Sequence, residues 1–189
     1  QEELSIDGDY LGRENCVDML VRSRPDLIGK IHASFIEAGA DAVETNTFGA
    51  NGLVLSEFDE EAASWARELC KEAAQVARDA CDSVQSPQRP RFVLGSIGPG
   101  TKLITLGQVS WETMFESYSQ AAGGLLEGGV DGFLIETCQD LLQVKCAINA
   151  CVIWGNALPT TQGFLKLLRS NATLLLHKAA NKQLLDERE

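Results

Sequence analysis

Polar side chains follow three apolar runs of this sequence at the points where each run stops. The first run ends in Glu44-Thr45-Asn46-Thr47, the second in the glycine-rich sequence GSIGPG, which contains Ser96 and Gly98, and the third in Glu136-Thr137-Cys138-Gln139. Carboxylates can bind an ammonium group, whereas hydroxyl and free backbone N–H groups can bind a carboxylate. If the three clusters converge, they predict a binding site for a small zwitterionic molecule.

Some of these side chains have a simpler explanation. Thr137 and Asp140 lie where a helix is expected to begin, so they could cap it. Glu44 and Glu136 are harder to explain in this way, because each directly ends an apolar strand, where an unpaired carboxylate is costly. We therefore expect these two glutamates to belong to the site.

Other chemistries receive little support from the sequence. GSIGPG lacks the Lys-Ser/Thr of a P-loop and the full GxGxxG spacing, so a tight turn that exposes backbone to a ligand is favoured over phosphate binding. His32 and His177 are the only histidines, and His32, next to Ile31 in the first predicted helix, is interpreted as a packing or surface residue. Cys138 has no visible basic partner, which argues against a nucleophilic cysteine, and no Ser/His/Asp set can be assembled.

Alternating helices and strands must position the three clusters. Helices are predicted over residues 23–39, 59–83, 110–127 and 140–151, and strands over 41–47, 91–97 and 132–136. In the first helix Ser23 is the predicted cap, and the apolar stripe consists of Ile28, Ile31, Phe35 and Ile36. This alternation predicts an α/β fold with parallel strands and a sheet covered on both faces, where ligands bind at the carboxyl ends of the strands.

Composition narrows the class of protein. The net charge of −11 argues against a nucleic-acid or anionic-membrane surface, and no apolar stretch approaches the length of a membrane helix. The six cysteines include no CxxC pair, and no histidine lies at a zinc-finger spacing. Free thiols in a reducing cytoplasm are therefore expected, and the first residues do not resemble a signal peptide.

The character of the sequence changes after Cys151. Residues 1–151 carry 11 basic and 24 acidic side chains, whereas residues 152–189 carry 5 and 3, and no further strand signal is seen. We predict a division into a domain over 1–151 and a divergent, helical tail over 152–189.

Long stretches of the chain resemble a known family. The stretches ENCVDML, RPDLIGKIHASFIEAGADAVETNTFGAN, RFVLGSIGPGTKL, TLGQVSWETM and GLLEGGVDGFLIETCQDLLQVKCAI are similar, in order, to the homocysteine-binding domain of cobalamin-dependent methionine synthase. The resemblance covers about residues 12–151. It is closer to this branch than to the betaine–homocysteine and S-methylmethionine–homocysteine methyltransferases, which share the fold.

The resemblance implies a fold, a reaction and a set of partners. Members of the family form a (β/α)8 TIM barrel and bind homocysteine at its carboxyl ends. A zinc ion held by three cysteines lowers the thiol pKa there. The methyl group comes from methylcobalamin, on a module charged from methyltetrahydrofolate. By position, Glu136 resembles the glutamate that binds the amino group of homocysteine, and Asn46 and Thr47 lie in the binding turn of the second strand. The predicted substrate-binding set is Glu136, Asn46, Thr47, Glu44, Ser96 and Gly98.

The chain also departs from the family pattern. The family's first strand is expected just before Gln1, and its three zinc cysteines lie in later strands, whereas this chain has no cysteine after Cys151. About three βα units of a partial barrel are therefore predicted, without zinc ligands and without catalytic residues of their own. The expected function is a truncated homocysteine S-methyltransferase domain, inactive alone. Two alternatives stay open: a non-catalytic α/β fragment, and an unrelated barrel enzyme, which the lack of a strand-end lysine disfavours.

Overall fold

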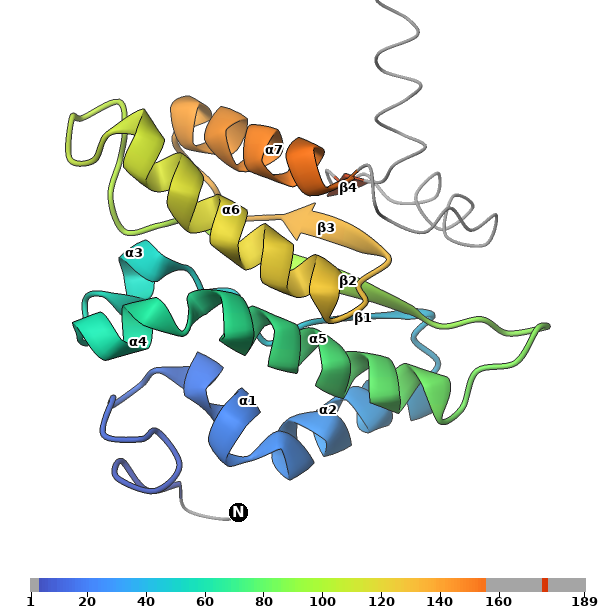
Figure 1. Ribbon diagram of the computed structural model, residues 1–189. Coiled ribbons are helices and arrows are strands. Elements are labelled where there is room, and N and C mark those ends of the chain that lie inside the picture. The colour runs from blue at the N-terminus through green and yellow to red at the C-terminus, as the bar shows by residue number, and fades with distance from the viewer. Residues whose placement is uncertain (1–3, 156–174, 177–189) are drawn as a thin grey trace, which may run out of the picture.

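The computed structural model describes residues 4–155 and the backbone of 175–176 (Figure 1). Its elements in chain order are η1 (Val17–Met19), α1 (Leu20–Ser23), α2 (Pro25–Glu37), β1 (Ala42–Glu44), α3 (Gly52–Leu55), α4 (Glu60–Ser64), α5 (Ala66–Asp82), β2 (Phe92–Ile97), α6 (Trp111–Glu127), β3 (Gly132–Ile135), α7 (Leu141–Gly155) and β4 (Leu175–Leu176).

The sheet has the order β1-β2-β3-β4, and its first three strands are parallel. The predicted α/β fold with three parallel strands is thereby confirmed. β4 pairs with β3 in the antiparallel direction, which contradicts the prediction of a tail without strands. A strand of two residues is too short to produce a readable alternation of apolar and polar residues, so it could not be predicted. The rest of the predicted helical tail lies outside the described residues.

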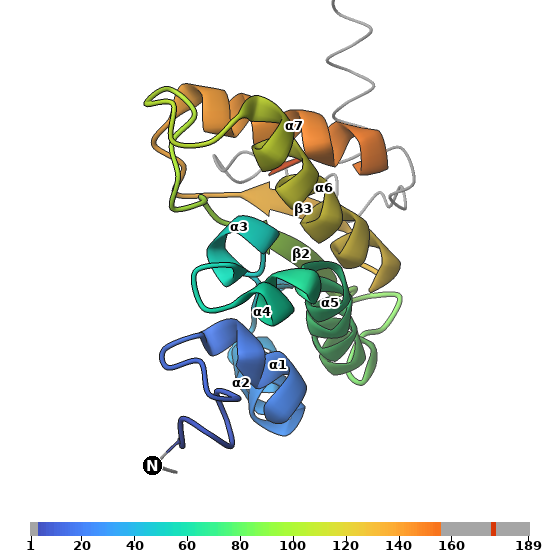
Figure 2. The ribbon, with the colours of Figure 1, turned by 60° about the vertical axis from the view of Figure 1, so that its left-hand side comes forward.

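The helices pack on one face of the sheet. Val43, Val93 and Phe133 point to that face and join a core built mainly from α5, α6 and α7. Figures 1 and 2 show these three helices side by side across the strands. Phe92 and Leu134 alternate with them and form a small separate cluster on the opposite face. The expectation of helices on both faces is therefore wrong for the described part of the chain.

The second predicted helix is interrupted. Instead of one helix over 59–83, α4 ends at Ser64 and α5 begins at Ala66. Asp59 caps α4 by accepting a hydrogen bond from the backbone N–H of Ala62 at 2.7 Å. Trp65, at the break, lies with its ring 4.8 and 4.9 Å from the guanidinium carbons of Arg13 and Arg22. At this residue the backbone N–H of Trp65 donates to the carbonyl of Ala62, three residues back, at 3.1 Å, which marks the end of α4.

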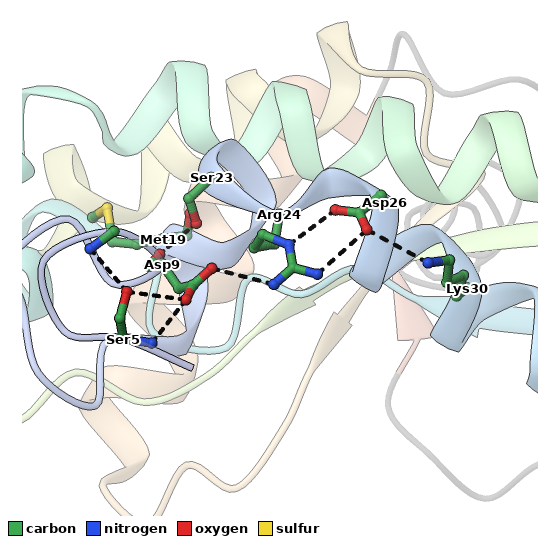
Figure 3. A network of polar contacts seen from close by, with 8 residues as sticks. Ser5, Asp9, Met19, Ser23, Arg24, Asp26 and Lys30 are labelled. Carbon is green, nitrogen blue, oxygen red and sulfur yellow. Dashed lines mark hydrogen bonds and ion pairs between the residues drawn. The ribbon is translucent and has the colours of Figure 1, made fainter. Parts of the chain in front are cut away.

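The beginning of α2 differs from the prediction. Ser23 does not cap this helix; its hydroxyl donates to the carbonyl oxygen of Asp9, the nearer of two carbonyls, and the carbonyl oxygen of Met19 lies 3.2 Å away. Arg24 occupies the cap position without a side-chain capping bond, and Pro25 fits the first turn because its missing N–H needs no partner. Arg24 instead bridges Asp9 and Asp26 (Figure 3), which ties the N-terminal loop to the helix.

The buried face of α2 consists of Ile28, His32 and Ile36. Ile31 and Phe35, which were predicted to lie in its apolar stripe, are exposed. The cause is geometric: positions 28, 32 and 36 are spaced by four residues and lie on one side of the helix, which rests against α5 and β1.

α5 and α6 pack closely because α6 carries glycine at the crossing. A Cβ atom at Gly124 would lie 2.0 Å from the carbonyl oxygen of Arg67 in α5. Any side chain there would push the two helices apart. Ser110, where this helix was predicted to begin, caps α6 by accepting a hydrogen bond from the backbone N–H of Thr113 at 3.0 Å.

Candidate functional site

The three polar clusters meet at what we call the carboxyl edge, the ends of β1, β2 and β3 with the residues that directly follow them. Because side chains alternate along a strand, Glu44, Ser96 and Glu136 share the face of the sheet that bears Ala42, Leu94 and Leu134. The prediction that these three side chains lie at one edge of the sheet is therefore confirmed, and the alternation of side chains along each strand puts them on the same face. That face is the one against which the described helices do not pack.

Ser96 and Glu136 form the central pair of this edge. The hydroxyl of Ser96 donates to Oε1 of Glu136 at 2.6 Å, and the backbone N–H of Glu136 donates to the carbonyl of Ile97 at 3.2 Å. Ser96 is buried and Glu136 is half-buried. The hydrogen bond fixes the carboxylate, and no other residue in the described part of the chain donates to its second oxygen. An oxygen in this position can accept from a ligand.

Glu44 adds a second carboxylate to the same edge. Its pKa is raised, first by the partial burial of the carboxyl group and second by the negative charge of Glu136. The charge of Glu136 makes ionisation of Glu44 less favourable, so a bound cation would be favourable beside Glu44 because it relieves this repulsion. An ammonium group has the charge and the donors for this position.

Thr45 and Thr47 use their hydroxyl groups within the protein. The N–H of Ser96 donates to Oγ1 of Thr45 at 3.0 Å, Oγ1 of Thr47 donates to the carbonyl of Ser96 at 2.7 Å, and the two hydroxyl oxygens are 2.6 Å apart. Because the single hydroxyl proton of Thr47 is donated to the carbonyl oxygen of Ser96, the hydroxyl of Thr45 must donate to Oγ1 of Thr47. The ring is buried and locks the end of β1 to the end of β2, which holds Ser96 in place for Glu136.

Asn46, also predicted in the site, contacts the N-terminal segment. Its Nδ2 donates to the carbonyl oxygen of Val17 at 2.9 Å. This bond brings residues just before α1 next to the carboxyl edge. The amide oxygen of Asn46 has no partner among the described residues.

Gly98 is required by close packing rather than by its backbone angles. A Cβ atom there would lie 2.4 Å from the carbonyl oxygen of Phe48 and 2.9 Å from its ring. Tyr118, a buried residue of α6, organises the same turn. Its hydroxyl donates to the carbonyl of Gly98 at 3.3 Å and accepts from the N–H of Gly100 at 3.2 Å. A buried tyrosine with two partners fixes the glycine-rich turn, but nothing in its helical spacing indicated that.

The residues after β3 have mixed roles. Asp140 caps α7, which was one of the roles expected from the sequence, because its Oδ1 accepts a hydrogen bond from the N–H of Leu142 at 2.8 Å. Its Oδ2 accepts from the N–H and hydroxyl of Thr105, which ties the loop after β2 to α7. Thr137 is not a cap. It has φ of 61°, a left-handed conformation that is uncommon for a β-branched residue. Such strain next to Glu136 is typical of functional sites.

Comparison with known proteins decides the family. A family model described as homocysteine S-methyltransferase matches residues 1–173. The chain belongs to this family. Two methionine synthases are similar over 146 residues: that of Mycobacterium tuberculosis (strain ATCC 25618 / H37Rv) is 48% identical, and that of Mycobacterium leprae (strain TN) is 46% identical. Each match covers 77% of this chain but only 12% of the relative's length.

Solved structures of this homocysteine S-methyltransferase family share the fold. The homocysteine methyltransferase MmuM from Escherichia coli matches in its metallated form with a TM-score of 0.59 and 19% identity, over 79% of this chain and 57% of that one. Its apo form matches with a TM-score of 0.56 and 20% identity, over 79% and 53%. At this identity the likeness concerns the α/β fold alone. In residues 4–155, no helix is long and apolar enough to cross a membrane.

The cysteines of this chain do not fit the three-cysteine zinc site that the resemblance implies. All six lie within residues 4–155, where they are free thiols, and five of them are buried. Burial raises the pKa of Cys16, Cys81 and Cys146 to about 11, the opposite of the low pKa that a zinc-bound thiolate needs. The described residues contain no group of three His, Cys, Asp or Glu side chains that could hold a metal ion.

Proposed function

We propose that this chain is the homocysteine-binding part of a methyltransferase of the methionine synthase type, in which methyl transfer to homocysteine gives methionine. The observation that carries the proposal is the Ser96–Glu136 pair at the carboxyl edge, with Glu44 close enough for its pKa to respond to Glu136. Glu136 would accept hydrogen bonds from the ammonium group of homocysteine. Ser96 would hold the carboxylate in the orientation for that contact.

The other predicted residues would shape the site. The buried Thr45–Thr47–Ser96 ring supports a structural role for Thr47, which would keep the two strand ends in register. Gly98 would let the turn after β2 approach Phe48. Asn46 would hold the N-terminal segment over the edge and offer its amide oxygen to the ligand.

Four further parts of the proposal rest on membership of the family. The three parallel strands would belong to a partial (β/α)8 barrel, with a domain over residues 1–151 followed by the tail over 152–189. α7 continues to Gly155, past this division. Partners would be the cobalamin- and methyltetrahydrofolate-binding modules of a longer enzyme, and the location would be the cytoplasm. Zinc, when bound to a member of the family, would lower the pKa of the substrate thiol.

Binding measurements with two related thiols test the role of Glu136. The 189-residue chain is titrated with L-homocysteine and with 4-mercaptobutanoate, which lacks the amino group, and binding is followed by NMR chemical shifts. A charge-assisted hydrogen bond contributes about 1.5–3 kcal/mol, so Glu136→Gln should raise the Kd for homocysteine about ten- to a hundredfold. The Kd for 4-mercaptobutanoate should not change.

Glu37→Gln is the matched control, because Glu37 is an exposed glutamate at the end of α2, away from the carboxyl edge. It should bind homocysteine like the unmodified chain. Equal binding of homocysteine by a folded Glu136→Gln chain would refute the assignment of Glu136.

The alternative is a folded α/β module without substrate binding. The same titration separates the two hypotheses. The alternative predicts that homocysteine and 4-mercaptobutanoate produce no saturable shifts in Glu44, Ser96 or Glu136. It also predicts that Glu136→Gln changes only the thermal stability of the chain.

A further inference from the structure

The glycine-rich turn after β2 is held by two buried side chains from the helices. Tyr118 lies in α6 and Gln143 in α7, and both are fully buried. Figure 1 shows the loop that begins with this turn beside the first turns of these two helices. Neither residue belongs to the carboxyl edge, so an effect of either on a ligand would have to pass through the turn.

Tyr118 binds the backbone on both sides of Pro99. Its hydroxyl donates to the carbonyl oxygen of Gly98 at 3.3 Å and accepts from the N–H of Gly100 at 3.2 Å. Burial raises the pKa of Tyr118, so the hydroxyl keeps its proton at neutral pH and remains a donor. Pro99 itself has no N–H and a restricted φ. A single hydroxyl therefore fixes the tightest part of the turn.

Gln143 holds the residues that follow. Its Nε2 donates to the carbonyl oxygens of Gly100 and Lys102, each at 3.3 Å. The Oε1 atom of the same amide is buried and has no hydrogen-bond partner in the part of the chain that the structure describes. An unpaired buried oxygen is costly, but the opposite orientation of the amide would place Oε1 against two carbonyl oxygens. The amide group of Gln143 is thus used entirely to hold the loop.

The loop is left with its acceptors occupied and its donors free. The two side chains bind the carbonyl oxygens of Gly98, Gly100 and Lys102. The N–H groups of Gly98, Thr101 and Lys102, in contrast, meet no acceptor among the described residues. Backbone N–H groups without acceptors attract anions. Because β2 ends at Ile97, this donor-rich turn begins at the carboxyl edge.

We propose that Tyr118 and Gln143 are positioning residues for the carboxylate of the substrate. They fix the turn so that its free N–H groups donate to the carboxylate of homocysteine, while Glu136 binds the ammonium group. Donors that are already fixed lose less conformational entropy on binding than donors on a mobile turn. The inference rests on the proposed function and adds a second end to the binding site.

Three thiols separate this role from that of Glu136. L-homocysteine carries an amino group and a carboxylate, 4-mercaptobutanoate only the carboxylate, and 3-mercaptopropylamine only the amino group. Each is titrated into the unmodified 189-residue chain and into Tyr118→Phe, and binding is followed by NMR chemical shifts. Tyr118→Phe should raise the Kd of the two carboxylates about three- to tenfold, the effect of one hydrogen bond. The Kd of 3-mercaptopropylamine should not change.

Matched variants control for the loss of a hydroxyl or an amide. Tyr10→Phe makes the same exchange at the other tyrosine, whose hydroxyl has no partner among the described residues, and should bind all three thiols like the unmodified chain. Gln143→Leu should repeat the carboxylate-specific loss. Gln120→Leu, which removes an amide that donates to Glu116 on α6, should not.

A measurement on the unmodified chain does not depend on the folding of any variant. Homocysteine and 4-mercaptobutanoate should shift the amide proton signals of Thr101 and Lys102, because a carboxylate accepts from these groups. 3-Mercaptopropylamine should leave both signals in place.

Two results would overturn the inference and leave the proposed function standing. One is equal weakening of all three thiols by Tyr118→Phe, which would show a merely structural role. The other is saturable binding of homocysteine without any shift of Thr101 and Lys102. If the unmodified chain bound none of the three thiols, the proposed function would fail and this inference with it.

Discussion

Substitution of Gly98 by alanine tests how tightly the carboxyl edge is assembled. The added Cβ would lie 2.4 Å from the carbonyl oxygen of Phe48, and the two atoms would have to separate by about 0.6 Å to reach the 3.0 Å below which real Cβ contacts essentially do not occur. The obstructing atom belongs to the backbone of the turn after β1. That turn is held by the Thr47–Ser96 hydrogen bond, so it cannot move without weakening the ring.

Two opposing effects determine how much Gly98→Ala changes the free energy of unfolding. Overpacking a tight site costs about 1–3 kcal/mol, whereas replacing any glycine by alanine gains about 0.4–1 kcal/mol by reducing the entropy of the unfolded chain. We expect a net loss of about 1–2 kcal/mol in the free energy of unfolding. For a chain of this size this lowers Tm by roughly 2–8 °C.

Urea unfolding followed by circular dichroism measures the effect, with Gly29→Ala as the control. Gly29 lies inside α2, and a Cβ atom there would meet only Val76 Cγ1 at 3.9 Å. Alanine should stabilise this helix by about 1 kcal/mol. The same glycine-to-alanine exchange should therefore raise the free energy of unfolding at position 29 and lower it at position 98. A Gly98→Ala chain as stable as the unmodified one would refute the close approach of the two turns.

Two further predictions concern titratable groups. Burial raises the pKa of Asp18 to about 6, above the 3.8 expected in the unfolded chain, so the folded state holds the extra proton between these values. The contribution of Asp18 to stability should therefore be present at about pH 4 and lost as the pH rises through about 6. Relative to the unmodified chain, Asp18→Asn should gain about 2–3 kcal/mol between pH 4 and 7 in urea unfolding; a constant difference would contradict the raised pKa. Among the six cysteines of residues 4–155, Cys138 is the one that is not buried. Ellman's reagent at pH 8 should modify one thiol in the native chain and six in urea, and none in native Cys138→Ser. Rapid modification of two or more native thiols would show that the core is more open than described.

Local patterns in the sequence determined the elements and the chemistry at their ends. Short apolar runs that alternate with helical periodicity predicted three parallel strands, and the polar residues at the strand ends predicted that Glu44, Ser96 and Glu136 share one edge. These predictions succeeded because strand alternation and parallel order are set by neighbouring residues along the chain. Element boundaries shifted by a few residues, and the predicted 59–83 helix divides at Trp65, whose ring contacts Arg13 and Arg22, both distant in sequence.

Only the tertiary structure decided how the side chains at this edge are used. Both Thr47 and Ser96 looked like ligand-binding hydroxyls, yet the proton of Thr47 is committed to Ser96 O and that of Ser96 to Glu136. Tyr118 and Gly98 hold one turn although they are 20 residues apart. Ile31 and Phe35 had the spacing of core residues but are exposed, because Ile28, His32 and Ile36 form the side of α2 that packs on α5 and β1. Hydrogen-bond partners and burial depend on which distant segments meet, and the local pattern of a sequence does not contain that information.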